Sequence, residues 1–149
     1  MVSLALDPGF GSAIGRGVGA IALYAVVGLI LMVFGFYAID WTTPGKLSLL
    51  VRGGCPNAVI VTAAGMFSMA LIVVVAIYSS AGKLDEGLLS SLIYGLVGII
   101  VQVGAVRLLE WITRLDIGGL IEDKNFAPAS VVVASAHVAL GLVVAVAIS

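Results

Sequence analysis

The sequence predicts an all-α integral membrane protein, with four transmembrane helices arranged as two parallel repeats of a helical hairpin. The composition, four long apolar stretches and a sequence repeat all support this fold class. Hydrophobic residues make up 62% of the 149 residues and charged residues 10%, whereas soluble domains have roughly 45–50% and about 25%. A chain with so few polar residues cannot cover itself with a polar surface in water, so we expect it in a membrane.

Each of the four apolar stretches is long enough to cross the hydrocarbon core of a bilayer, which takes about 20 helical residues. We expect helices because the core offers no water to the open edges of a sheet, and four strands cannot close a barrel. The predicted helices cover about residues 18–39, 57–78, 88–109 and 127–148.

Proline and asparagine mark the starts of the second and fourth helices. Pro56 and Pro128 lie at or just before these starts, where a proline costs the helix no hydrogen bond. Asn57 and Asn125 lie close by and are candidates to cap the first turns.

The segments outside the four helices are short. Residues 1–17 are rich in glycine and are predicted to form an N-terminal segment outside the spans. They lack the basic and apolar regions of a removable signal peptide, so the first span is expected to act as the insertion signal. Residues 79–87 form a short polar turn, and the whole chain, 1–149, is therefore predicted to be a single membrane domain.

The chain matches itself without a gap at a shift of 70 residues. Asp40-Trp41-Thr42-Thr43 falls on Glu110-Trp111-Ile112-Thr113, and such a quartet at the polar end of two apolar spans is improbable by chance. The repeat units cover about residues 18–79 and 88–149. Because each unit has two spans, both should insert in the same orientation, as parallel repeats.

Basic residues predict how the chain is oriented. One side of the membrane carries Arg16 and Lys83, and the other carries five basic residues: Lys46, Arg52, Arg107, Arg114 and Lys124. Short cytoplasmic loops carry the excess of basic residues. We therefore expect both termini outside and the two longer loops in the cytoplasm. Cys55 is the only cysteine, so no disulfide can form within the chain.

The sequence offers no pattern typical of an enzyme. It has no glycine-rich phosphate loop between a strand and a helix and no cysteine or histidine pair at metal-binding spacing. The sequence has seven basic and eight acidic residues, so it lacks the excess of positive charge that is typical of a nucleic-acid-binding protein. We therefore predict no catalytic residues, no cofactor, no metal and no nucleic-acid partner.

Two polar residues lie inside the predicted spans. His137 shares a helix face with the small residues Ala134, Gly141 and Ala145, so we expect it to point into the helix bundle. Its imidazole is either a neutral group hydrogen-bonded to a neighbouring helix or part of a proton or ligand pathway. Gln102 is expected to make an interhelical hydrogen bond, and a role in a polar pathway is the alternative.

A second candidate site lies where the cytoplasmic loops leave the membrane. It comprises Asp40, Trp41, Thr43, Pro44, Gly45, Lys46, Arg107, Glu110, Trp111 and Thr113. Interfacial anchoring by tryptophan and a snorkelling arginine explains these residues by position alone. The alternative is a groove lined by both quartets that binds a lipid headgroup or a partner protein. Residues 45–54 and 115–124 are each candidates for a short amphipathic segment in the interface.

Three stretches of the sequence are distinctive: the loop Thr43-Pro44-Gly45-Lys46-Leu47, the opening Asn125-x-Ala127-x-Ala129 of the last span, and the tail from His137 to Ser149. They resemble the YjfL-like family of small bacterial membrane proteins, of unknown function, in its actinobacterial form. The resemblance covers the chain from about Val18 onward. It implies four spans in two repeats and a location in the bacterial inner membrane, and it supplies no catalytic residues. The second loop departs from the first, with Arg114-Leu115-Asp116 in place of Pro44-Gly45-Lys46.

Two functions fit these observations. The first is a non-catalytic protein that associates with itself or is an accessory subunit of a larger membrane complex, for instance a respiratory or envelope assembly. The second is a small oligomeric transporter, channel or proton-conducting protein that uses His137 and Gln102. Both have the lipid bilayer as a partner, and the first adds a membrane protein or a second copy of the chain.

Overall fold

The computed structural model describes residues 9–43, 45–80, 83–114 and 116–149, and these residues form six α-helices. The helices are α1 (Phe10–Thr42), α2 (Leu47–Arg52), α3 (Pro56–Ser79), α4 (Leu84–Thr113), α5 (Ile117–Glu122) and α6 (Ala129–Ile148). Four of them, α1, α3, α4 and α6, are long and apolar enough to cross a membrane. The predicted all-α membrane protein with four spans is therefore confirmed.

The helix boundaries differ from the predicted ones mainly in α1. This helix begins at Phe10, whereas the first span is predicted to begin at about residue 18. Each glycine lowers helix stability by about 1 kcal/mol, but extending an existing helix adds a hydrogen bond per residue without a new nucleus. The glycine-rich segment therefore continues the apolar helix that follows it.

The two longer loops each contain a helix of six residues. α2 and α5 start at residues 47 and 117 and end at residues 52 and 122, which is the spacing of the sequence repeat. Leu47, Ile117 and Ile121 are buried against the bundle, so part of the apolar side of each short helix faces protein and not lipid. The parallel relation of the two halves stays a prediction.

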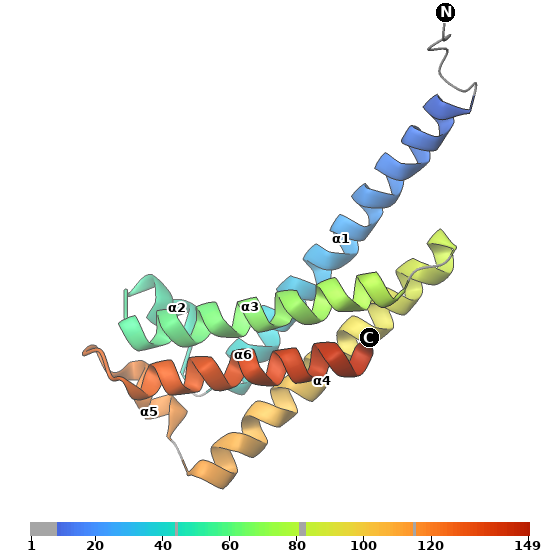
Figure 1. Ribbon diagram of the computed structural model, residues 1–149. Helices are drawn as coiled ribbons and strands as arrows, with labels where there is room; N and C mark the ends of the chain where they lie inside the picture. Colours follow the sequence, from blue (N-terminus) through green and yellow to red (C-terminus); the bar gives the residue numbers. More distant parts are fainter. Residues whose placement is uncertain (1–8, 44, 81–82, 115) are drawn as a thin grey trace, which may run out of the picture.

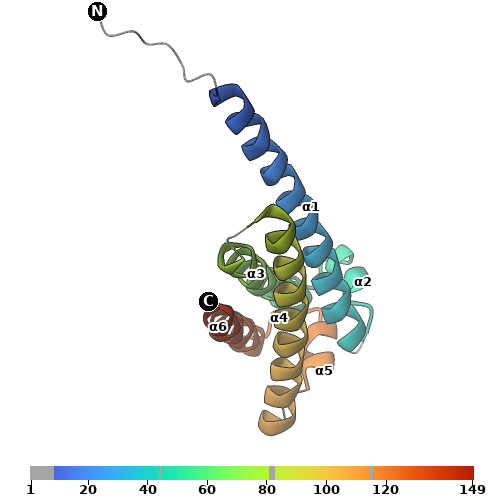
Figure 2. The same ribbon diagram turned by 90° about the vertical axis from the view of Figure 1, so that its right-hand side faces the viewer.

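α3 and α6 form the centre of the molecule. They run side by side over their length and make the most extensive contact between any two helices (Figures 1 and 2). α4 packs on both of them, whereas α1 packs on α3 and α4. Leu31, Ile72, Ile99 and Val133, one from each long helix, belong to the same buried core cluster. α2 and α5 lie together at one end of this bundle (Figure 1).

Small residues determine how closely the central helices approach. A Cβ atom added to Gly141 of α6 would lie 1.9 Å from Ser68 Oγ and 3.1 Å from Ser68 Cα on α3. A Cβ atom added to Gly98 of α4 would lie 2.4 Å from Ile72 Cγ2. Lipid tails are as apolar as the helices, so the hydrophobic effect does not drive helices together inside a membrane. Close packing of the backbones is then a main source of helix–helix affinity.

The first half of α1 lies outside this packing. The buried residues of α1 are Leu31, Gly35 and Ile39, all in its second half. Added Cβ atoms on Gly11, Gly15, Gly17 and Gly19 would meet none of the described residues within 4 Å. Figure 1 shows this part of the helix projecting away from the other helices, beyond the start of α4.

Candidate functional site

The backbone oxygen of His137 joins three helices in the middle of the bundle. It accepts a hydrogen bond of 2.9 Å from Ser68 Oγ on α3 and another of 2.9 Å from Gln102 Nε2 on α4. The imidazole is buried, with 6% of the residue exposed, and its Nδ1 lies 3.0 Å from the oxygen of Val133, one turn earlier in α6. Because the backbone oxygen of Val133 can only accept, Nδ1 carries the proton in this contact.

This cluster agrees with the sequence analysis in two respects. His137 points into the bundle, and Gln102 makes an interhelical hydrogen bond, as predicted. Ser68 also belongs to the cluster, because its hydroxyl reaches across from α3 to α6. It can do so because Gly141 has no side chain and leaves room for the serine hydroxyl.

One atom of the cluster has no partner. Gln102 Oε1 is buried and accepts no hydrogen bond from the described residues. Gln102 and His137 line a cavity of about 20 Å³ together with Arg107, Thr43 and Met69. A single water molecule requires at least about 10–15 Å³, so the cavity has room for about one water beside a group that can bond to it.

Asn57 links the two halves of the chain. Its side chain is fully buried at the start of α3, and Nδ2 lies 3.1, 3.2 and 2.8 Å from the backbone oxygens of Leu120, Asp123 and Asn125. Its Oδ1 accepts a hydrogen bond of 2.9 Å from the backbone N–H of Ala127. One side chain therefore fixes the connection between α5 and α6 to the first half of the molecule.

The prediction that Asn57 and Asn125 cap their helices was wrong. The N-cap of α3 is Cys55 and that of α6 is Pro128, and neither helix has a side-chain capping bond. Asn57 lies one residue after Pro56, inside the first turn, so its side chain is free to turn toward α5 and α6. The sequence contained no signal for this contact, because its partners lie 63 to 70 residues away.

Arg107 connects the two acid–Trp–x–Thr quartets. Its guanidinium pairs with Glu110 on the same helix and donates a hydrogen bond of 3.3 Å to Thr43 Oγ1 at the end of α1. Asp40 accepts a hydrogen bond of 3.1 Å from the backbone N–H of Ser48, which positions α2. The acidic residues of the two quartets, Asp40 and Glu110, therefore take part in contacts that connect α1, α2 and α4.

The remaining predicted interface residues lie at the surface. Trp41 is 89% exposed and Trp111 is 78% exposed, as expected for side chains that face lipid or the membrane interface. Thr113 donates to the backbone oxygen of Leu109. Pro44 lies outside the described residues.

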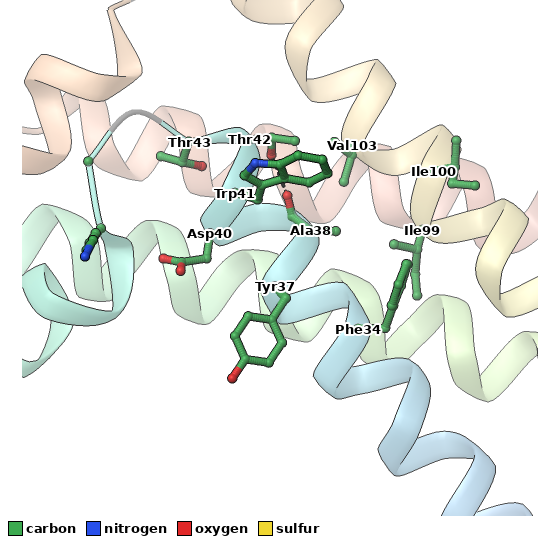
Figure 3. Close-up of a pocket in the computed structure, with 12 residues that line it drawn as sticks. Phe34, Tyr37, Ala38, Asp40, Trp41, Thr42, Thr43, Ile99, Ile100 and Val103 are labelled. Atoms are coloured by element: carbon green, nitrogen blue, oxygen red, sulfur yellow. Dashed lines mark hydrogen bonds between the residues drawn. The ribbon is translucent and has the colours of Figure 1, made fainter.

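A groove of about 780 Å³ runs between the last turns of α1 and the middle of α4 (Figure 3). Its α4 side is apolar and consists of Ile99, Ile100 and Val103. Its α1 side includes Phe34 and Tyr37 and ends in polar residues of the first quartet and the following loop: Asp40, Thr42, Thr43 and Lys46. Trp41 also lines it. The α4 residues of the groove lie about two turns before Glu110. Among the described residues, the first quartet therefore lines the groove and the second quartet does not.

The chain is similar to small transmembrane proteins of mycobacteria. Residues 13–148 match the family model described as Domain of Unknown Function (DUF350). A UPF0719 transmembrane protein of Mycolicibacterium paratuberculosis is 35% identical over 135 residues, which cover 90% of this chain and 89% of that protein. A UPF0719 transmembrane protein of Mycobacterium bovis is 34% identical over 115 residues, 76% of this chain and 73% of that protein. No solved structure matches. On the family match and these identities, the chain belongs to the DUF350 family, as a multi-pass membrane protein.

Proposed function

We propose that this protein is a non-catalytic interaction subunit, which binds a membrane partner through the projecting first half of α1. The partner is a larger membrane complex, for instance a respiratory or envelope assembly, or a second copy of the chain. The observation that carries this proposal is the length of α1 relative to the bundle on which it packs.

α1 is too long to lie entirely in the hydrocarbon core. Its 33 residues span about 50 Å, at 1.5 Å per residue, whereas the 20 residues of α6 span about 30 Å, which is the thickness of the core. Even at a tilt of about 40°, the upper end of the usual range, α1 would still cover about 38 Å of depth. Part of the helix is therefore expected to leave the hydrocarbon.

The projecting part carries an apolar stripe. Leu84, the first residue of α4, lines a groove with α1 residues from Arg16 to Tyr24, so residues 10–15 lie beyond the start of α4. Phe10 and Ile14 in this part, and Val18 at the level of the start of α4, follow one another at intervals of four, which places them on one face, and they are 46%, 50% and 60% exposed. An apolar helix face outside both protein and hydrocarbon is expected to bind a partner.

The glycines of the same segment would favour a helical partner. Gly11, Gly15 and Gly19 also follow at intervals of four, and they are uncovered in the monomer. In membrane helices such spacing lets a second backbone approach closely. The glycines thus supply a contact surface next to the apolar stripe.

Photocrosslinking in native membranes tests this function. A photoreactive residue at Ile14 of the full chain should crosslink to a protein, identified by mass spectrometry as another subunit or a second copy. The same residue at Ser12, on a different face of the projecting helix, and at Val143, on the exposed face of α6, provides the controls. Crosslinking of Ile14 to lipid only would overturn the proposal.

The cluster around His137 supports the alternative of a transporter or proton-conducting protein. Gln102 Oε1 has no hydrogen-bond partner among the residues described, and the adjoining cavity reaches Arg107 near the loop end of α4. The cavity has room for only about one water, so conduction would require further waters or an oligomer. Flux in liposomes that is lost in the His137→Ala variant would favour this alternative over the interaction subunit.

The proposed orientation in the bacterial inner membrane places both termini outside and α2 and α5 in the cytoplasm, because the loop end of the bundle carries five of the seven basic residues. Cys55, the only cysteine, precedes α3 at that end and is partly exposed. An impermeant thiol reagent should label it in inverted vesicles and not in intact cells. Labelling in intact cells would reverse the orientation.

A further inference from the structure

We propose that the groove between α1 and α4 binds one phospholipid, with an acyl chain between the two helices and the phosphate at Lys46. This inference concerns the second half of α1 and does not depend on a partner at its first half. Three properties of the groove support it: its lining, its length and the charges at one end.

The lining resembles the surroundings of an acyl chain. Phe34 from α1 and Ile99, Ile100 and Val103 from α4 face one another across the groove (Figure 3). Phe34 is 51% exposed and Ile100 is 66% exposed, so the described part of the chain does not fill the space between them. In a bilayer the space is open to lipid, and a chain that enters it replaces lipid contacts by contacts with two helices.

The length of the groove fits one leaflet. Its α1 side runs from Phe34 to Thr43, the C-cap of the helix, and these ten residues rise about 14 Å from the first to the last. Half of the hydrocarbon core is about 15 Å. A groove that starts at the end of a spanning helix and extends for this distance matches the reach of one acyl chain from the interface to the bilayer midplane.

The polar end carries one cation and one anion. Lys46 lines the groove and has no ion-pair partner among the described residues. Asp40 lines the same end and accepts a hydrogen bond from Ser48 through one carboxylate oxygen. A phosphate fits Lys46, and an ammonium group fits the remaining oxygen of Asp40. The charges therefore favour a zwitterionic headgroup with a primary ammonium, phosphatidylethanolamine, over the anionic phosphatidylglycerol.

Native mass spectrometry of the full chain in mild detergent, with equal amounts of phosphatidylethanolamine and phosphatidylglycerol, tests the site. We expect one retained phospholipid per chain, with phosphatidylethanolamine favoured about two- to fivefold, as partly exposed charge pairs allow. Ile100→Trp fills the groove and should lower retention about tenfold, since the loss of about two buried methylene groups suffices for this. Val143→Trp is the matched control, because Val143 has the same exposed fraction, 66%, on α6.

Charge variants test the headgroup. Lys46→Gln should lower the retention of both lipids, whereas Asp40→Asn should abolish the preference for phosphatidylethanolamine. Equal retention by the Ile100→Trp and Val143→Trp variants would show annular lipid only and overturn the site, as would the absence of retained lipid in the unaltered chain. Retention without any headgroup preference would overturn the assignment of Asp40. Only variants that elute as a monodisperse, helical protein are included in these comparisons.

Discussion

α6 and α1 are both apolar spanning helices that contain glycine, but Gly141 of α6 and the first glycines of α1 have opposite surroundings. Gly141 of α6 faces Ser68 of α3 so closely that a Cβ atom would lie 1.9 Å from its hydroxyl. In the part of the chain that the structure describes, no atom lies within 4 Å of a Cβ atom added to Gly11, Gly15 or Gly19 of α1. The difference indicates that stability resides in the contact of α3, α4 and α6, whereas the first half of α1 remains available for a partner.

The Gly141→Val substitution should destabilise the packed contact between α3 and α6. Its side chain would collide with Ser68, including the backbone Cα atom at 3.1 Å, so rotation of the serine alone cannot relieve the clash. Overpacking typically costs about 1–3 kcal/mol and occasionally more, and here the hydrogen bond from Ser68 to His137 would be lost as well. Thermal unfolding in detergent, or loss of the monodisperse species, measures the effect.

Gly104→Val is the matched control for this substitution. Gly104 lies in α4 and has nothing within 4 Å of an added Cβ atom. The variant should unfold at the temperature of the unaltered chain or slightly above it, because valine replaces glycine within a helix. Equal destabilisation by both substitutions would show that the contact between α3 and α6 is not the main source of stability.

Asn57→Ala should have the second largest effect. The substitution leaves three backbone oxygens and one N–H group without their buried partner, and each unsatisfied group can cost about 1–3 kcal/mol. Water entering at the loop end would satisfy some of them, so we expect about 2–3 kcal/mol in total. Hydrogen exchange should also accelerate in α5 and in the connection to α6.

Asn125→Ala provides the comparison for Asn57. Asn125 contributes its backbone oxygen and N–H to the same connection, which the substitution keeps, and its side chain is exposed. Its stability should change by no more than about 0.5 kcal/mol, as for other surface substitutions. A large loss in this variant would mean that the exposed side chain, and not Asn57, orders the connection.

These contacts show what could be predicted from the sequence. Long apolar stretches predict the four spans because the thickness of the bilayer sets the length of a helix that crosses it. Small residues three, four and eight positions from His137 predict its inward direction. The partners of Asn57 and Ser68 depend instead on how two helices far apart in sequence pack, which local patterns do not encode. The groove likewise follows from the crossing of α1 and α4, and the sequence analysis expected both quartets in it.

Gln102→Met should have a smaller effect on the packed core. Met32 occupies the corresponding position in the first half of the sequence repeat, so methionine is a side chain that the scaffold already accommodates. The variant loses the hydrogen bond to His137 but also removes the unpartnered Oε1. Interhelical hydrogen bonds in membranes average about 0.6 kcal/mol, and we expect a loss no larger than about 1 kcal/mol in unfolding experiments. A loss of several kcal/mol would indicate that a bound water completes the cluster.

Gly15→Val should have the smallest effect on stability and thereby test the exposed side of the comparison. An added side chain at Gly15 meets nothing within 4 Å, so the unfolding temperature of the isolated chain should stay the same or rise slightly. In native membranes the same variant should weaken partner crosslinking from Ile14, because a branched side chain would hold the second backbone away. Unchanged crosslinking would leave the apolar stripe of Phe10, Ile14 and Val18 as the contact surface and exclude the glycine face. A destabilised monomer would contradict the exposed position of Gly15 itself, since only a contact within the chain could transmit the change to the bundle.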